Sequence, residues 1–156
     1  MKVQELMSRD VKSCGREASL AEAGAAMRDW NLGILPVLDT KKKISGLITD
    51  RDICIALSSK SVPATQMLVG DVIKGEVYSC KGEDDLREAL HVMREHRIRR
   101  LPVVDGRGQL KGLLSLDDVA AAMGKTQGAP SAKDVAETLK AICLTPPGFA
   151  PRKVNA

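Results

Sequence analysis

The feature that most constrains this chain is an internal duplication: residues 3–58 recur at 69–124 without a gap. The strongest block is Leu-Pro-Val-x-Asp at 35–39, which returns at 101–105. A repeat of this length marks a supersecondary unit that cannot bury its apolar face alone and therefore stacks on its neighbour. We expect two similar units that share one compact fold.

The two copies share one predicted order of elements. In the first copy, Leu20, Ala23 and Met27 keep the three- and four-residue spacing of an amphipathic helix, and apolar runs separated by a polar turn predict two strands. The expected elements of the first and second copies are a strand at 11–14 and 77–80, a helix at 19–30 and 85–96, a strand at 34–38 and 101–104, a strand at 44–48 and 110–114, and a helix at 50–57 and 116–123.

The expected fold class is α+β, with two β-α-β-β-α repeats packed sheet to sheet about a pseudo-twofold axis. One copy has too few strands for independent stability. We place the first repeat at 1–58, a linker at 59–68, the second repeat at 69–124, and a C-terminal helix and tail at 125–156.

The C-terminal segment departs from the repeat. Ser131 and Asp134 have the spacing of a capping box, which predicts that a helix starts there. We expect this helix to pack on the module or on a dimer partner, with a regulatory lid as the alternative. Residues 145–156 contain three prolines and are expected to be extended or disordered.

The doubled motif resembles the CBS domain, a small module named after cystathionine β-synthase. In each copy Leu-Pro-Val-x-Asp is followed by a Gly-Leu stretch with a downstream acid, at 46–53 and 112–119. The resemblance covers residues 1–124 and implies a paired module that often dimerises into a disc. It also implies an adenosine-containing ligand, such as AMP, ADP, ATP, S-adenosylmethionine or a dinucleotide, in clefts between the repeats. The implied role is that of a sensor for a client protein.

A hydroxyl-x-x-Asp pattern occurs at matched positions, as Thr49 with Asp52 and Ser115 with Asp118. Each hydroxyl lies where a predicted strand ends and a helix begins, and free N–H groups at a helix start favour a phosphate. The carboxylate can accept hydrogen bonds from the two vicinal hydroxyls of a ribose. The same spacing is also a capping pattern that needs no ligand. Its matched recurrence favours the ligand interpretation.

An adenine ring needs an apolar slot edged by backbone groups. Candidate walls combine the residues around each conserved proline with the preceding short strand, although the same residues also suit an ordinary core. The candidates are Ile34, Pro36 and Ser13 for one cleft, and Pro102 and Ser79 for the other.

The copies differ most just before the proline, where the second copy carries Arg97, Arg99 and Arg100. Guanidinium groups bind phosphate oxygens in pairs, so we expect this cluster to neutralise phosphates. A solvated basic edge or an interface with an acidic partner is the alternative. Arg51 is a further candidate for phosphate contact, with a salt bridge equally compatible.

Other functions have little support in the sequence. No catalytic constellation or phosphate loop occurs, so no enzyme and no catalytic cofactor are expected, and a magnesium ion would enter only with a polyphosphate. A net charge of +4 with 2% aromatic residues disfavours nucleic-acid binding. Without a signal peptide or a membrane-length apolar run, we expect a cytoplasmic protein without membrane contact.

Cys14 and Cys80 occupy equivalent strand positions, and Cys54 and Cys143 lie on apolar helix faces, so we expect all four cysteines to be buried. The leading function is a regulatory adenosine-nucleotide sensor that forms a homodimer and signals to a client protein. A ligand-free dimerisation or docking module is the alternative.

Overall fold

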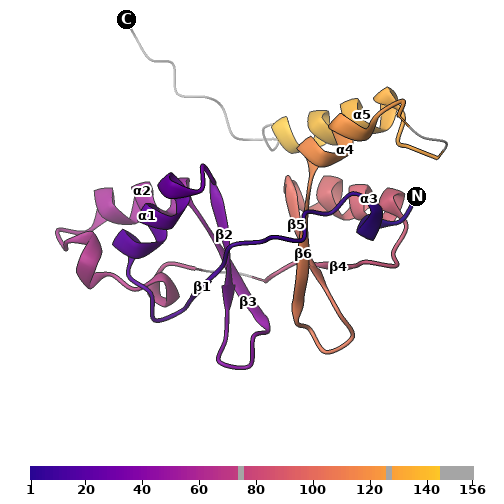
Figure 1. Ribbon diagram of the computed structural model, residues 1–156. Coiled ribbons are helices and arrows are strands. Elements are labelled where there is room, and N and C mark those ends of the chain that lie inside the picture. Colours follow the sequence, from indigo (N-terminus) through magenta and orange to yellow (C-terminus); the bar gives the residue numbers. More distant parts are fainter. Residues whose placement is uncertain (74–75, 126–127, 145–156) are drawn as a thin grey trace, which may run out of the picture.

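The computed structural model describes residues 1–73, 76–125 and 128–144, and it contains two repeats, each with a three-stranded sheet and its own helices (Figure 1). The two sheets stand next to each other in the middle of the molecule, and helices lie on their outer sides. The first repeat comprises β1 (Cys14–Gly15), α1 (Leu20–Asp29), β2 (Ile34–Leu38), β3 (Ile44–Thr49) and α2 (Asp50–Ser59); the second comprises β4 (Cys80–Lys81), α3 (Leu86–His96), β5 (Arg100–Val104), β6 (Leu110–Ser115) and α4 (Leu116–Ala122).

The sheets have the same topology and register. In each, a short first strand pairs in parallel with the second, which pairs antiparallel with the third. A register shift interrupts the antiparallel pair between Val37 and Leu38 and again between Val103 and Val104. The predicted α+β fold with pseudo-twofold symmetry is therefore confirmed. The first strand of each copy is shorter than expected and begins at its cysteine. In the first copy the segment before it crosses to the other repeat, where Ser8 pairs with Leu113.

This crossing exchanges a segment between the repeats. The 3-10 turn η1 (Val3–Glu5) lies at the start of the first repeat, yet Val3 and Met7 are buried in the core of the second. In the same way η3 (Val69–Asp71) completes the core of the first repeat through Val69. Each core therefore needs residues from the start of the opposite copy.

Two backbone hydrogen bonds hold the first crossing in place. The amide of Ser8 donates to the carbonyl oxygen of Leu113 and the amide of Leu113 donates to that of Ser8, each at 2.9 Å. Gly112 makes this approach possible, since a Cβ there would lie 2.8 Å from the Ser8 carbonyl oxygen. The N-terminal strand segment is thus attached to β6.

The predicted C-terminal helix is present as α5 (Ala132–Cys143), and it packs on α3 and α4. Ser131 caps it, because its hydroxyl accepts from the amide of Asp134 at 3.2 Å while the Asp134 carboxylate accepts in return. Val135 and Thr138 are buried, and the Arg94 guanidinium donates to the Thr138 hydroxyl at 3.1 Å. The prediction for residues 145–156 lies outside the described residues.

The prediction that all four cysteines are buried is partly wrong. Cys80 is buried and Cys14 half-buried, but Cys54 and Cys143 are exposed. Cys54 lies on a face of α2 that no other element covers in the described chain, and Cys143 is the last residue of α5. Among the described residues, no helix is long and apolar enough to cross a membrane.

Candidate functional site: the cleft between the repeats

A cleft of about 220 Å3 opens between the two repeats, and both contribute side chains to it. Its walls come from three places: the crossing N-terminal segment, the loop and strand after α1, and the start of α4 with its preceding strands. The lining residues are Ser8, Asp10, Val11 and Lys12; Asn31, Leu32, Gly33, Ile34 and Pro36; and Arg100, Leu113, Ser115 and Asp118. This volume is below the roughly 300–1,000 Å3 of typical ligand pockets.

On the side of the second repeat, Asp118 lies one turn into α4. Its Oδ2 atom accepts from the Ser115 hydroxyl at 2.6 Å and from the Ser115 amide at 2.8 Å. Within the described residues, no hydrogen bond involves Oδ1. One oxygen of this carboxylate therefore takes part in the cap, while the other has no hydrogen-bond partner among the described residues. Arg100 is half-buried beside it, 4.0 Å from Asp117 and thus held only weakly.

On the side of the first repeat, the walls are apolar. Ile34 and Pro36 are buried in β2 at the point where it faces the cleft. The preceding loop begins at Asn31, which has a left-handed backbone with a φ of 51°, a conformation that asparagine tolerates better than most residues. This turn brings Leu32 and Gly33 to the cleft. An aromatic base could lie flat against such a surface.

The crossing segment supplies the charged edge of the cleft. The Lys12 ammonium lies 3.0 Å from the Asp10 carboxylate and 4.1 Å from the centre of the Trp30 ring. The sequence interpretation missed Ser8, Asp10 and Lys12 as site residues. No local pattern in the sequence indicates that the N-terminal segment crosses to the second repeat, and these three residues reach the cleft only through that crossing.

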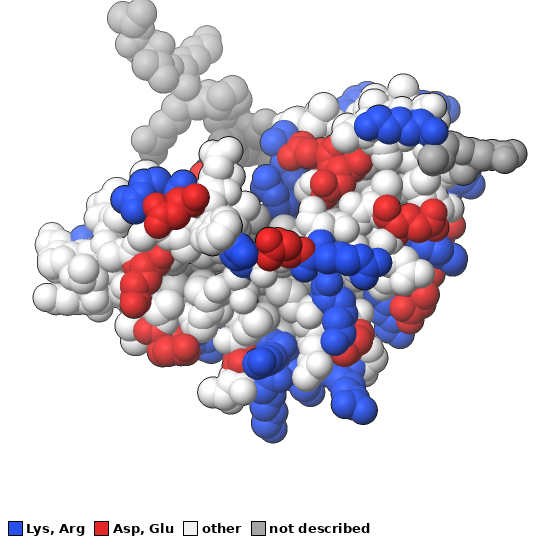
Figure 2. Space-filling model, in the orientation of Figure 1, with Lys and Arg blue, Asp and Glu red and all other residues white. Residues whose placement is uncertain are grey.

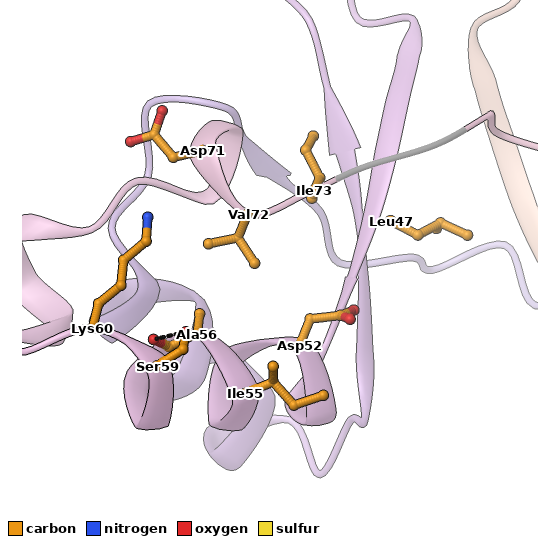
Figure 3. Close-up of a pocket in the computed structure, with 9 residues that line it drawn as sticks. All are labelled: Leu47, Asp52, Ile55, Ala56, Ser59, Lys60, Asp71, Val72 and Ile73. Atoms are coloured by element: carbon orange, nitrogen blue, oxygen red, sulfur yellow. Dashed lines mark hydrogen bonds between the residues drawn. The ribbon is translucent and has the colours of Figure 1, made fainter.

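A second hollow lies beside Asp52, the symmetry partner of Asp118, and its volume is about 290 Å3 (Figure 3). Its lining residues all fall between 47 and 73: Leu47, Asp52, Ile55, Ala56, Ser59, Lys60, Asp71, Val72 and Ile73. Figure 3 shows them on α2, on β3 and around η3. The hollow thus belongs to the first repeat and the segment that completes it, and it is not equivalent to the inter-repeat cleft.

The structure brings only part of the predicted site together. Ile34, Pro36, Arg100, Ser115 and Asp118 meet in the cleft.

The remaining candidates lie elsewhere. Thr49 caps α2 through Asp52, with 2.6 Å between its hydroxyl and Oδ2, and Pro102 is buried in β5. Ser13 lines a separate hollow beside Asp39. The other four are exposed and line neither the cleft nor the hollow at Asp52: Arg51, Ser79, Arg97 and Arg99.

The sequence model of the CBS domain matches residues 3–59 and 69–125. The chain belongs to the CBS domain family. The two matches coincide with the two repeats, so the module is a CBS pair.

Curated relatives include small proteins and long enzymes. The CBS domain-containing protein YhcV of Bacillus subtilis is 31% identical over 130 residues, covering 83% of this chain and 91% of the relative. Homoserine O-acetyltransferase of Methanohalophilus mahii is 35% identical over 123 residues, 79% of this chain. The chain spans only 24% of that enzyme's length.

Solved structures of CBS pairs are also similar. CBSX2 in complex with AMP has a TM-score of 0.68 at 26% identity, covering 78% of this chain and 94% of that one. The CBS pair of protein MJ0100, in complex with 5′-methylthioadenosine and S-adenosyl-L-methionine, has a TM-score of 0.69 at 21% identity, over 78% and 94% of the two chains. The second likeness shows the fold alone.

Proposed function

We propose that this chain is a regulatory sensor that binds an adenosine-containing ligand in the inter-repeat cleft and signals its presence to a partner protein. The observation that supports this most is the meeting of Asp118 and Arg100 from one repeat with Ile34 and Pro36 from the other. A nucleotide presents a flat base, a diol and an anion. The cleft offers an apolar wall, a carboxylate oxygen that has no hydrogen bond in the described part of the chain, and basic groups.

The proposed pose follows from these groups. The base lies against Ile34 and Pro36, and the ribose hydroxyls donate to Oδ1 of Asp118. The phosphates lie near Arg100 and Lys12, both of which reach the cleft. Because α4 spans only seven residues, its dipole is a smaller contribution than the sequence pattern suggested.

Relatives support the ligand class. The similar CBSX2 structure, at 26% identity, contains AMP, which consists of an adenosine moiety and a phosphate. In the proposed pose the adenosine lies in the cleft, and the group attached to it lies at the rim. Which adenosine derivative binds here, and whether magnesium accompanies a polyphosphate, is therefore decided by Arg100, Lys12 and Asp10.

The test is isothermal titration calorimetry with AMP, ADP, ATP, S-adenosylmethionine and NADH, on protein shown to carry no nucleotide. ATP is titrated with and without magnesium. We expect at least one ligand to bind with a Kd below 1 mM, and the adenosine-sensor proposal is wrong if none does.

A second candidate function is a docking or dimerisation module that binds no ligand. It is favoured by the capping bonds at Thr49 and Ser115, which are complete without a ligand. Sedimentation of the purified protein tests the expected homodimer separately from ligand binding. A reaction is not assigned to the cleft, and a cytoplasmic location stays a prediction.

Nucleic acid is a weaker candidate partner. On the face that Figure 2 shows, basic and acidic side chains are interspersed, and blue residues gather mainly toward the lower hairpin tips. A continuous basic surface is what phosphate-backbone binding requires. A salt-dependent shift assay with DNA and RNA is the direct check.

A further inference from the structure

The β2–β3 and β5–β6 hairpins end side by side at the lower edge of the molecule, opposite α4 and α5 (Figure 1). An antiparallel bridge joins Lys43, which precedes β3, to Gln109, which precedes β6. The amide of Ile44 also donates to the carbonyl oxygen of Gly108 at 3.3 Å. The joined hairpin tips, residues 39–43 and 105–111, thus form one continuous surface to which each repeat contributes half.

This surface is basic. Figure 2 shows Lys and Arg side chains gathered at the hairpin tips. Among the ion pairs of the described residues, one belongs to this surface, between the Lys111 ammonium and the Asp105 carboxylate at 3.2 Å. The other cations of the tips have no acidic partner within the described part of the chain. They are exposed and comprise Lys41, Lys42, Lys43 and Arg107.

The two acids of the surface are engaged by the backbone. Oδ1 of Asp39 accepts hydrogen bonds from the amides of Lys41 and Lys43, at 2.8 and 2.9 Å. Oδ1 of Asp105 accepts in the same way from two amides of the second turn, at 2.9 and 3.0 Å. The hydrogen bond from the Gln109 amide is the largest of the effects that lower the pKa of Asp105. Both carboxylates therefore hold the turns in shape, and most of the lysine charge stays uncompensated.

The chemistry of this surface is electrostatic. Residues 40–43 and 106–109 include no large apolar or aromatic side chain. The aliphatic stem of Lys43 lies over Gly108, since a Cβ added to that glycine would be 3.9 Å from the Lys43 Cδ. A cation of the first repeat thus reaches across the second. Exposed cations without an apolar centre suit an anionic partner and steer its approach.

Shape and composition distinguish among the possible anions. The bridge between Lys43 and Gln109 gives the strand order β2, β3, β6, β5 at this end, so the outer strands lie about 14 Å apart. The major groove of DNA, about 12 Å wide, admits a two-stranded ribbon and is too narrow for four strands. Single-stranded nucleic acid needs aromatic platforms, and stable attachment to a bilayer needs an apolar or lipid anchor besides basic residues. An extended segment of Asp and Glu residues needs neither.

The surface also depends on how the repeats are placed relative to each other. Its two halves meet through one bridge and one hydrogen bond of 3.3 Å, slightly longer than the roughly 2.7–3.2 Å of a typical one. A change in the angle between the repeats therefore changes the spacing between their cations. The nucleotide cleft is lined by both repeats, so a ligand with different affinities for two such angles shifts the population between them.

We propose that the joined hairpin tips are the docking surface for an extended acidic segment of a partner protein, and that a ligand in the cleft alters this docking through the angle between the repeats. Carboxylates of the partner pair with the three lysines of the first tip and with Arg107 of the second. The second half of the proposal rests on the proposed nucleotide function, whereas the docking surface itself does not.

The probe is a peptide of eight glutamates with blocked ends, titrated into the isotope-labelled full chain and followed by NMR spectroscopy. We expect saturable shifts of the backbone amides at 40–43 and 106–111, with a Kd of about 1 mM or lower at low ionic strength. In about 0.2 M salt the Kd should rise by about fivefold or more, because salt screens exposed charges. A peptide of eight serines should cause no shifts. Absence of saturable shifts at the tips overturns the docking surface.

The decisive variant combines Lys41→Glu with Arg107→Glu, which reverses one exposed charge in each repeat and leaves the backbone bonds of both turns in place. The matched control, Lys125→Glu with Lys140→Glu, makes the same change in net charge on exposed residues after α4 and in α5, at the opposite end of the molecule (Figure 1). We expect the first variant to lower the peptide affinity by about tenfold or more and the control by less than about twofold. Equal losses would reflect net charge alone and would overturn the surface.

Two other partners are tested with the same variants. A DNA duplex or phosphatidylserine vesicles that bind more tightly than the glutamate peptide, and lose binding in the Lys41→Glu, Arg107→Glu variant, would overturn the acidic protein segment.

The coupling has its own test. With AMP at saturation, we expect the peptide Kd to change by about fivefold or more. An unchanged peptide Kd in the presence of bound AMP refutes the coupling. If AMP does not bind, the nucleotide function and the coupling fail together, while the docking surface is decided by the peptide titration and its variants.

Discussion

Asp118 uses its two carboxylate oxygens differently, and this makes its two roles separable. Oδ2 accepts hydrogen bonds from the hydroxyl and the amide of Ser115. In the proposed pose, Oδ1 accepts hydrogen bonds from the ribose. Asparagine can keep one capping acceptor but loses the charge and one acceptor. The residue therefore allows ligand binding to be changed with little change in the fold.

We expect Asp118→Asn to lower the affinity of the cleft for AMP by about tenfold or more, because a hydrogen bond to a charged group is worth about 1.5–3 kcal/mol. The free energy of unfolding should change by less than about 1 kcal/mol. Calorimetry and urea unfolding measure the two effects. The matched control Asp52→Asn changes the equivalent cap outside the cleft and should leave AMP affinity unchanged; equal losses in both variants would contradict the assignment.

The cysteines give a second prediction at this scale. Burial, with a smaller effect of nearby acids, raises the pKa of Cys14 to about 11 and that of Cys80 to about 12. Because the thiolate is the reactive form, Cys54 and Cys143 should react with a maleimide at pH 8 while Cys14 and Cys80 stay unmodified. Mass spectrometry of the labelled protein identifies the modified cysteines. Rapid labelling of Cys80 in the folded protein would contradict the prediction.

The same pKa shifts have a consequence for stability. Above pH 9.0, the unshifted value, the unfolded chain loses thiol protons that the folded chain still binds. The free energy of unfolding therefore falls as pH rises from about 9 toward 12. Replacing Cys80 with alanine should flatten this part of the profile in urea unfolding at several pH values.

At the scale of elements, Gly112 decides whether the N-terminal segment can cross to β6. A Cβ there would lie 2.7 Å from the Met7 sulfur and 2.8 Å from the Ser8 carbonyl oxygen. We expect Gly112→Ala to destabilise the fold by about 1–3 kcal/mol, which is typical of overpacking. Because Ser8 also lines the cleft, AMP affinity should fall as well.

The comparison variant is Gly106→Ala in the β5–β6 turn, where an added Cβ has open space. It should be neutral or stabilise the protein by up to about 1 kcal/mol. Urea unfolding of both variants is the measurement. A neutral Gly112→Ala would mean that the crossing segment moves freely, and the exchange between the repeats would lose its support.

Predictability from the sequence differed between elements. The helices and paired strands were predicted to within about two residues, because their apolar spacing is local and occurs twice. The short first strands were misplaced, since 11–13 and 77–79 read as strand by composition but precede the pairing that begins at Cys14 and Cys80. The exchange of η1 and η3 depends on long-range packing that no local pattern encodes.

In the candidate site too, residues that belong to a local pattern could be predicted, whereas residues placed by the three-dimensional fold could not. Asp118 and Ser115 were predicted because a capping pattern and a ligand pattern coincide at a strand-to-helix turn. Arg100 reaches the cleft while Arg97 and Arg99 do not, since Arg97 ends α3 in a left-handed turn and Arg99 points to Cys143, 3.7 Å away. Side-chain direction at a helix end depends on the backbone turn, which the charge pattern alone does not determine.

For the whole molecule, the exchanged segments make the two repeats dependent on each other. The core of the second repeat contains Val3 and Met7, and the core of the first contains Met67 and Val69. Loss of either repeat removes part of the other's core. A pair of independent lobes would unfold in two steps, but a pair that shares its cores in this way is expected to unfold in one.

Calorimetry of the full chain should therefore show one unfolding transition, and a cleft ligand should shift it as a whole. AMP at about 100 times its Kd stabilises the folded state by about 2.7 kcal/mol. For a chain of this size that corresponds to a rise in Tm of about 5–10 °C. The ligand touches both repeats, so the transition should move without splitting. Two transitions, of which AMP shifts only one, would show that the exchanged segments do not join the repeats into one cooperative unit and would place the ligand within a single repeat.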